Sequence, residues 1–331
     1  MAERIHGVNL SGWFIPETWV SPSLFAATGA ANAVELQRAL GPAVYSERLR
    51  HHFETFITED DFRRIAAKIP AIDYVDRAIE RAEKNKLSVL LSLATVPGGQ
   101  GDSNESPTTP ESTADWHSSK NGRHVALTTL EKLAARYGSA ASLLGIELLD
   151  SPVVSVRKNI FTMTDGIPAH YLRNFYRDAY ALMRAHMPEE KAIVFSASGH
   201  PDLWKGFMRG GKYKNVVMDL HLYHYRDESA CDITSPKGIS QAIARNRKLL
   251  REATSTGFPI LVGEWSAAAV LSSASMTPEC RAAYERVFVS SQLASFDTAW
   301  GWYFQTWKTE KRIPAWDARV ALAPLERAMI D

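Results

Sequence analysis

The sequence predicts a single α/β domain of the (β/α)8 type, the TIM barrel, with a shortened or missing second strand region. Short apolar runs alternate with amphipathic stretches along the 331 residues, which is the pattern of repeated β-α units with parallel strands. A hydrophobic content of 45% is enough to bury one large core. Neither an internal repeat nor a break in composition divides the sequence, so residues 1–331 are expected to form one domain.

Seven short apolar runs are expected to be the strands. They are Ile5–Leu10, Leu87–Leu93, Leu143–Leu149, Ala192–Ser196, Val216–His221, Ile260–Glu264 and Ala299–Phe304. A closed barrel of this type has eight strands, and the gap falls at "KIPAID" in this sequence. Either a very short strand at Lys68–Ile72 fills the gap, or the barrel is locally open.

Between the strands, apolar residues recur at three-and-four spacing, which predicts amphipathic helices. These helices are expected at 58–68, 74–85, 127–138, 170–185, 239–253 and 280–294. Thr58, three residues before Asp61, resembles a capping box, and Gly138 is placed like a glycine that ends a helix. Residues 95–123 are rich in Gly, Ser, Thr, Asn and Pro, so a long surface loop is expected there, with a lid over the active face as one possibility.

Charge and hydropathy exclude several classes of partner. The net charge of +1, without a long basic run, gives no electrostatic reason to expect nucleic acid or an anionic membrane as a partner. An apolar run of about 18 residues, as a membrane span needs, does not occur. The first residues lack an apolar targeting core, so we expect a cytoplasmic protein. The alternative is a secreted protein whose leader has been removed.

Reactive groups of a (β/α)8 barrel lie at the carboxyl ends of its strands, on one face. The positions there combine carboxylates with aromatic side chains, which predicts an acidic, aromatic cleft. They are Asn9, Trp13, Glu17, Ser92, Ala94, Asp150, Ser151, Asp219, His221, Tyr223, His224, Glu264, Gln305, Trp307 and Lys308. Neither a cofactor motif nor the ligand spacing of a metal site occurs among them, so no cofactor and no metal are expected.

Several stretches together resemble one known family. "GVNLSGWFIPETWVSPSLF" (7–25), "GIELLDSP" (145–152), "DLHLYHY" (219–225), "VGEWSAA" (262–268), "GWYFQTWKTE" (301–310) and "AWD" (315–317) are similar to motifs of the fungal exo-β-1,3-glucanases of glycoside hydrolase family 5. The similarity runs in order through nearly the whole chain. It implies a TIM barrel with the ancestry of a retaining glycosidase.

The resemblance also implies roles for particular positions. Retaining hydrolysis uses a nucleophile and an acid/base, two carboxyl groups about 5–5.5 Å apart. The family's nucleophile corresponds to Glu264, whereas Ser151 stands where the family has the acid/base Glu of an Asn-Glu-Pro triplet. Further departures are Ala94 for a His, Lys68 for an Arg and Gln305 for a stacking Trp. Ordinary β-1,3-glucanase activity is therefore expected to be absent or very weak.

The surviving groups suggest a changed acid–base site. Asp150 is expected to face Glu264, and two close carboxylates resist double ionisation, so one of them is expected to hold a proton near neutral pH. With His221 and Tyr223, they are the predicted catalytic residues. An Asp before Ser-Pro is also a turn former, and His221 and Tyr223 are also compatible with purely structural roles. The predicted substrate-binding residues are Asn9, Trp13, Glu17, Ser151, Gln305, Trp307 and Lys308.

Three functions remain open from the sequence. The first, which the sequence favours, is a repurposed acid–base catalyst acting on a small molecule in a biosynthetic pathway, by dehydration, cyclisation or isomerisation. The second is a non-catalytic pseudoenzyme that binds β-glucan or another carbohydrate. The third is a residual glycosidase or transglycosidase that uses Glu264. The expected ligand is a small molecule or a short oligosaccharide, and the sequence leaves the oligomeric state open.

Overall fold

The computed structural model describes residues 5–57, 71–100, 115–159, 162–225, 232–270 and 277–323. By its internal contacts the chain divides into two compact units. The first unit combines the amino-terminal residues up to Ser11 with everything from Met218 onward, and the second spans Gly12–Val217. The expectation of a single domain stays a prediction, and the units are described one at a time.

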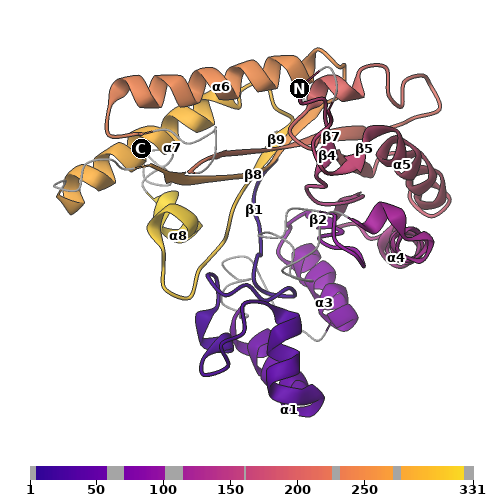
Figure 1. Ribbon diagram of the computed structural model, residues 1–331, viewed down its shortest axis with the longest axis horizontal. Helices are drawn as coiled ribbons and strands as arrows, with labels where there is room; N and C mark the ends of the chain where they lie inside the picture. The colour runs from indigo at the N-terminus through magenta and orange to yellow at the C-terminus, as the bar shows by residue number, and fades with distance from the viewer. Residues whose placement is uncertain are drawn as a thin grey trace. The chain divides into compact units, whose positions relative to one another are not determined.

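The first unit is built on four parallel strands. They are β1 (Ile5–Val8), β7 (Val216–His224), β8 (Ile260–Ala269) and β9 (Gly301–Phe304), in the order β1-β9-β8-β7. Helices α6 (Pro236–Thr254) and α7 (Pro278–Ser295) pack against each other and against β8 (Figure 1). The short helices η5 (Pro314–Trp316) and α8 (Ala318–Ala321) follow β9.

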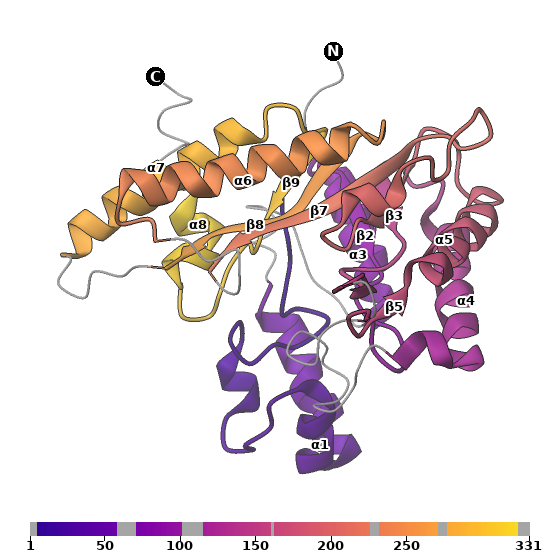
Figure 2. The same cartoon turned by 45° about the horizontal axis from the view of Figure 1, so that its top comes forward.

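The second unit has β3 (Leu143–Glu147) between β2 (Val89–Ser92) and β6 (Ala192–Ser196), all parallel. Helices α4 (Lys120–Tyr137) and α5 (Ala169–Arg184) lie side by side, as Figure 2 also shows. The remaining elements of this unit are α1 (Ala33–Thr55), α3 (Ala71–Lys84), the short strands β4 (Val154–Ser155) and β5 (Ile167–Pro168), and the 3-10 turns η1 (Pro22–Phe25), η2 (Asp115–Ser118) and η3 (Pro201–Trp204).

Each unit has its own aromatic core. In the first unit the buried Trp265 indole meets the rings of Phe296, Trp302 and Phe304 at centroid distances of 5.0–5.5 Å. In the second unit Tyr176, Phe195 and Trp204 pack together within 5.1–5.5 Å. Because apolar burial is the main favourable term in folding, these clusters hold the strands in place beneath the polar residues described below.

All seven predicted strands are present, and β6 has the predicted bounds. Two strands run further than predicted: β7 ends at His224 rather than His221, and β8 ends at Ala269 rather than Glu264. Glu264 and His221 therefore lie inside strands, not at their ends. The polar residues interrupt the apolar pattern before the backbone pairing stops, which is why the strands seemed shorter in the sequence.

The predictions for the segments between the strands need three corrections, one each for a helix, a loop and a short strand. Helix α1 was not predicted, and the predicted loop 95–123 contains η2 and the beginning of α4. The proposed short strand Lys68–Ile72 is wrong at its end, because Ala71 and Ile72 belong to α3. Residues 68–70, the predicted helix 58–68 and residues 101–114 of the predicted lid lie outside the described residues. Within the described residues, every helix is too short or too polar to cross a membrane.

Candidate active site

Glu264 lies in the middle of β8, at an irregularity of the sheet. The pairing register of β8 with β9 shifts between Val262 and Trp265, so that Gly263 and Glu264 are the residues inside the irregularity. A bulge of this kind re-aims a side chain relative to a regular strand. The Glu264 side chain is 22% exposed, so most of it is covered.

Three neighbouring groups point at the Glu264 carboxylate. The Tyr223 hydroxyl donates to Oε2 at 2.7 Å, and Asn9 Nδ2 donates to Oε1 at 3.3 Å. Nδ1 of His221 lies 3.2 Å from Oε2. His221 and Tyr223 are two residues apart on β7, so their side chains leave the same face of the strand. Asn9 follows the end of β1, so three strands of the first unit supply the site.

A second carboxylate holds His221 from the other side. Oδ2 of Asp219 lies 2.9 Å from His221 Nε2, and its Oδ1 accepts a hydrogen bond from the Gly263 backbone N–H at 2.7 Å. The Asp219 side chain is 1% exposed, so this carboxylate is fixed. The imidazole is thus clamped between Asp219 and Glu264 in the order carboxylate, imidazole, carboxylate.

This geometry sets the charge of the site. Burial by itself lowers the pKa of His221, but the charges of Glu264 and Asp219 and their hydrogen bonds outweigh it and raise the His221 pKa well above its ordinary value. Burial by itself raises the pKa of Glu264, whereas the charge and hydrogen bond of His221 and the hydrogen bond of Tyr223 lower it below its ordinary value. Glu264 is therefore ionised and His221 protonated near neutral pH.

An ionised, rigidly held carboxylate can serve as a nucleophile or can stabilise a positively charged transition state. The predicted sharing of a proton between Asp150 and Glu264 stays a prediction. Protonated His221 carries an N–H on each ring nitrogen, and these face Asp219 Oδ2 and Glu264 Oε2. The chemistry available within the first unit is thus carboxylate chemistry beside a fixed cation.

Two further aromatic rings pack beside Tyr223, whose hydroxyl contacts Glu264. The Tyr223 ring lies 5.6 Å from the Trp316 ring, and the Tyr225 ring meets Trp316 edge-on at 5.0 Å. Sequence reasoning assigned no role to Trp316 or Tyr225, nor to Asp219, which it placed only at the end of a strand. The signal for Asp219 was its place in Asp219-x-His221-x-Tyr223, a period of two that puts all three side chains on one strand face.

The other predicted residues of the first unit are held near Asn9. Gln305 is buried, and its Oε1 accepts from the Ser11 hydroxyl at 2.8 Å. The Trp307 backbone N–H donates to the Asn9 carbonyl at 2.8 Å. Trp307 and Lys308 are partly buried. The stretch after β9 therefore braces the backbone of Asn9, which in turn contacts Glu264.

Two predicted residues of the second unit have structural partners. Glu17 accepts from the Gly12 backbone N–H at 3.1 Å and from Trp19 Nε1 at 2.8 Å. Trp13 is fully buried, and its Nε1 donates to the Phe53 carbonyl at 3.3 Å. With no exposed surface, Trp13 packs in the core of this unit, and its role as a substrate-binding residue stays a prediction.

Asp150 and Ser151 follow β3 in the second unit. The Asp150 backbone N–H donates to the Leu93 carbonyl at 3.0 Å, and Gln100 Nε2 donates to the Asp150 carbonyl at 3.2 Å. Ser151 has a φ of +37°, a left-handed conformation that fits the expected turn. The predicted approach of Asp150 to Glu264 stays a prediction. Sequence reasoning also gave no role to Glu147, a buried carboxylate that accepts from the Ser92 hydroxyl at 2.7 Å.

The fold defines an α/β protein of the TIM-barrel class, in which Glu264 is a carboxylate held by Tyr223, His221 and Asn9. Comparison with known proteins gives the same class. The chain is 29% identical to a probable glucan 1,3-beta-glucosidase A of Emericella nidulans, over 98% of this chain and 89% of the relative. It is 27% identical to a glucan 1,3-beta-glucosidase of Blumeria graminis, over 95% and 84% of the two chains.

Solved structures confirm the fold. The rutinosidase of Aspergillus niger superposes with a TM-score of 0.76 at 16% identity, covering 96% of this chain and 93% of that one. The endoglucanase Cel5A of Thermotoga maritima gives a TM-score of 0.55 at 15% identity, covering 96% of both chains. No family model matches the sequence. The resemblance to fungal exo-β-1,3-glucanases that the motifs indicated is thus confirmed, and so is the TIM-barrel fold class.

Proposed function

We propose that the protein is a carbohydrate-active enzyme in which Glu264 attacks the anomeric carbon of β-glucosides whose leaving group departs without a proton. The observation that carries this proposal is the triple bracing of Glu264 by Tyr223, His221 and Asn9. Donors on a carboxylate favour its ionised form, and the ionised form is the nucleophile. The names of the fungal relatives, glucan 1,3-beta-glucosidases, supply the substrate class.

In the proposed step, a carboxylate oxygen of Glu264 forms a bond to the anomeric carbon while the bond from that carbon to the leaving group breaks. The leaving group carries away the bonding electron pair and is released as an anion, so no proton donor is needed. Water or a sugar hydroxyl then attacks the same carbon, releases Glu264 and gives its proton to solvent. Attack by water gives hydrolysis, and attack by a sugar hydroxyl gives transglycosylation.

Ser151 is the reason for limiting the substrate to good leaving groups. We infer from the resemblance that Ser151 occupies the acid/base position, and a serine hydroxyl does not protonate a sugar oxygen near neutral pH. General acid catalysis typically contributes about 10²–10⁴-fold to a rate. The rate of cleavage of ordinary β-1,3-glucan is therefore expected to be at least about 10²-fold lower than the rate for activated glucosides.

The test is covalent labelling with 2-deoxy-2-fluoro-β-D-glucosyl fluoride, followed by intact and peptide mass spectrometry. We expect a mass increase of one fluoroglucosyl group on the peptide that contains Glu264, and no increase in Glu264→Gln. The matched control is Glu252→Gln, a surface carboxylate on α6, which is expected to label like the wild type. Labelling at another residue, or equal labelling of Glu264→Gln, contradicts the proposed nucleophile.

A second candidate is the repurposed acid–base catalyst, and one observation favours it. His221 is held as an imidazolium between two carboxylates and is thus a proton donor beside Glu264. A protein of this kind leaves Glu264 unlabelled by the fluoroglucosyl reagent. Saturable binding of laminari-oligosaccharides without labelling or turnover instead supports the non-catalytic carbohydrate-binding protein.

A further inference from the structure

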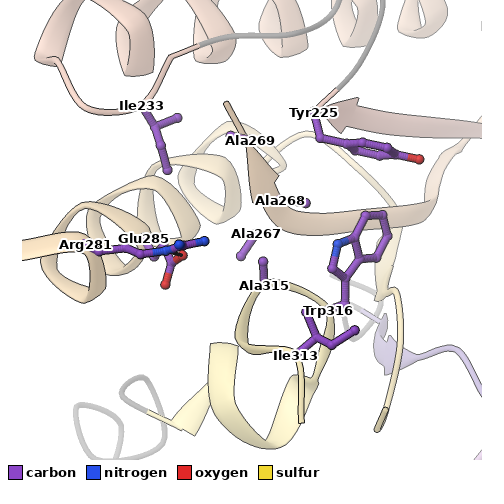
Figure 3. A pocket seen from close by; sticks show the side chains of 10 residues that line it. All are labelled: Tyr225, Ile233, Ala267, Ala268, Ala269, Arg281, Glu285, Ile313, Ala315 and Trp316. Atoms are coloured by element: carbon purple, nitrogen blue, oxygen red, sulfur yellow. Dashed lines mark hydrogen bonds and ion pairs between the residues drawn. The ribbon is translucent and has the colours of Figure 1, made fainter. Parts of the chain in front are cut away.

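A pocket of about 270 Å³ opens within the first unit, beside the cluster of the Tyr223, Tyr225 and Trp316 rings. In Figure 3, Arg281 and Glu285 from α7 lie on one side of it, and Tyr225 and Trp316 lie on the other. Three successive alanines of β8, Ala267–Ala269, lie between the two sides. Their small side chains leave the hollow that larger residues on this strand would fill.

The two sides of the pocket differ in chemistry. Tyr225 and Trp316 offer ring surfaces set edge to face, with centroids 5.0 Å apart. Opposite them, Arg281 Nε donates to Glu285 Oε1 at 3.0 Å. A guanidinium has five N–H donors and a carboxylate about four acceptor positions. Within the part of the chain that the structure describes, this contact leaves the terminal guanidinium nitrogens and the second carboxylate oxygen available for a ligand.

We propose that this pocket binds one neutral pyranose ring. A sugar hydroxyl is both a donor and an acceptor, so neighbouring hydroxyls match a guanidinium and a carboxylate that stand side by side. The C–H face of the same ring suits an indole or phenol surface. Because the charges of Arg281 and Glu285 offset each other, the pair selects neither an anion nor a cation.

The size of the pocket limits the ligand to one ring. Pockets for drug-sized ligands hold roughly 300–1,000 Å³, and this one lies just below that range at about 270 Å³. Trp316 also contacts Tyr223, whose hydroxyl bonds Glu264. The pocket therefore adjoins the Glu264 site through a shared ring while using different polar residues. This inference goes beyond the proposed function, because it requires binding and no reaction.

The experiment uses the full chain carrying Glu264→Gln, so that no turnover occurs, and methyl β-D-glucopyranoside as the probe. The indole N–H signal of Trp316, assigned with Trp316→Phe, is followed by NMR during the titration. We expect a saturable shift of that signal. Adding Arg281→Ala is expected to raise the dissociation constant at least tenfold, and Arg281→Lys to raise it less. Lys248→Ala, an exposed cation of another i,i+4 pair, is the matched control and is expected to change nothing.

A second variant blocks the hollow directly. Ala268→Leu is expected to abolish the Arg281-dependent binding while the remaining indole signals keep their positions. The proposal is overturned if Arg281→Ala binds the glucoside as tightly as its parent. It is also overturned if phenol, which has one ring but no neighbouring hydroxyls, binds with equal affinity and shows the same dependence on Arg281. Both results are independent of fluoroglucosyl labelling in the wild type, so failure here is distinguishable from failure of Glu264 as the nucleophile.

Discussion

At the scale of single residues, the ionisation and orientation of the Glu264 carboxylate depend on the groups that donate hydrogen bonds to it. The shortest of its three contacts is the one from the Tyr223 hydroxyl, at 2.7 Å. A hydrogen bond to a charged group contributes roughly 1.5–3 kcal/mol, more than a bond between neutral groups. Tyr223 is therefore a positioning residue that holds both the charge and the orientation of Glu264.

Replacing Tyr223 with Phe removes this donor and keeps the ring against Trp316. We expect the pKa of Glu264 to rise, since a hydrogen bond to its ionised form is lost. The acidic limb of the rate profile for a dinitrophenyl β-glucoside should then move to higher pH. The measurement is kcat/KM against pH for both proteins.

Tyr225→Phe is the matched control, because Tyr225 lies against the same Tyr223 and Trp316 rings. Its acidic limb is expected to stay where the wild type has it. An acidic limb that is unchanged in Tyr223→Phe shows that this hydroxyl does not tune Glu264.

Gly263 has no room for a side chain. A Cβ at this position meets Asp219 Oδ1 at 2.1 Å, and Asp219 is buried. Gly263→Ala therefore displaces a carboxylate that also holds His221, and overpacking of this kind costs roughly 1–3 kcal/mol. We expect a lower free energy of urea unfolding together with loss of activity.

Gly211→Ala is the companion variant, because a Cβ at Gly211 meets nothing within 4 Å. It is expected to unfold like the wild type. Equal stability of the two alanine variants contradicts the close approach of Asp219 to Gly263.

At the scale of elements, the irregularity of β8 decides where Glu264 points. The sequence predicted the strand and the residue, because "ILVGE" is a buried apolar run that ends in a carboxylate. It did not predict that pairing continues to Ala269 or that the register shifts between Val262 and Trp265. Bulges depend on contacts with two neighbouring strands, and these contacts are long-range in the sequence.

Helix α1 was missed because its sequence lacks the pattern by which the other helices were predicted. Its buried residues are only Leu36 and His52, so it lacks the apolar stripe that identified the other helices. Gly41 interrupts it with φ 75° and precedes Pro42, a pair of residues that usually signals a turn. The amino-terminal signal was nevertheless present, since Asn32 and Glu35 have the spacing of a capping box.

This capping box predicts a stability effect. Asn32 Oδ1 accepts from the backbone N–H groups of Val34 and Glu35 at 3.1 and 3.0 Å. Asn32→Ala leaves both donors without this acceptor, so the free energy of urea unfolding should fall by about 1 kcal/mol. Asn32→Asp keeps an acceptor and should restore most of the loss. Equal stability of Asn32→Ala and the wild type contradicts a stabilising cap.

At the scale of the whole molecule, the Asp219, His221 and Glu264 array links folding to pH. The pKa of His221 is raised in the folded protein. Its contribution to stability is therefore fully present below its unfolded pKa of about 6.5. That contribution is lost as the pH rises through the folded pKa. The pKa of Glu264 is lowered in the folded protein. Its contribution to stability is therefore present above its unfolded pKa of about 4.3. That contribution is lost as the pH falls through the folded pKa. The array therefore stabilises the fold most in the mildly acidic window between the two unfolded values.

Replacing His221 with Gln tests this linkage, because glutamine keeps a hydrogen-bonding group but removes the titrating cation between the two carboxylates. The wild type should exceed His221→Gln in the free energy of urea unfolding by the largest margin at about pH 5–6.5, and the margin should shrink at alkaline pH as the folded wild type loses the imidazolium proton. The measurement is a series of urea titrations from mildly acidic to alkaline pH on both proteins. If the difference in free energy of unfolding between the two proteins stays constant across the series, His221 is neutral in the folded protein. In that case no cation beside Glu264 keeps its carboxylate ionised.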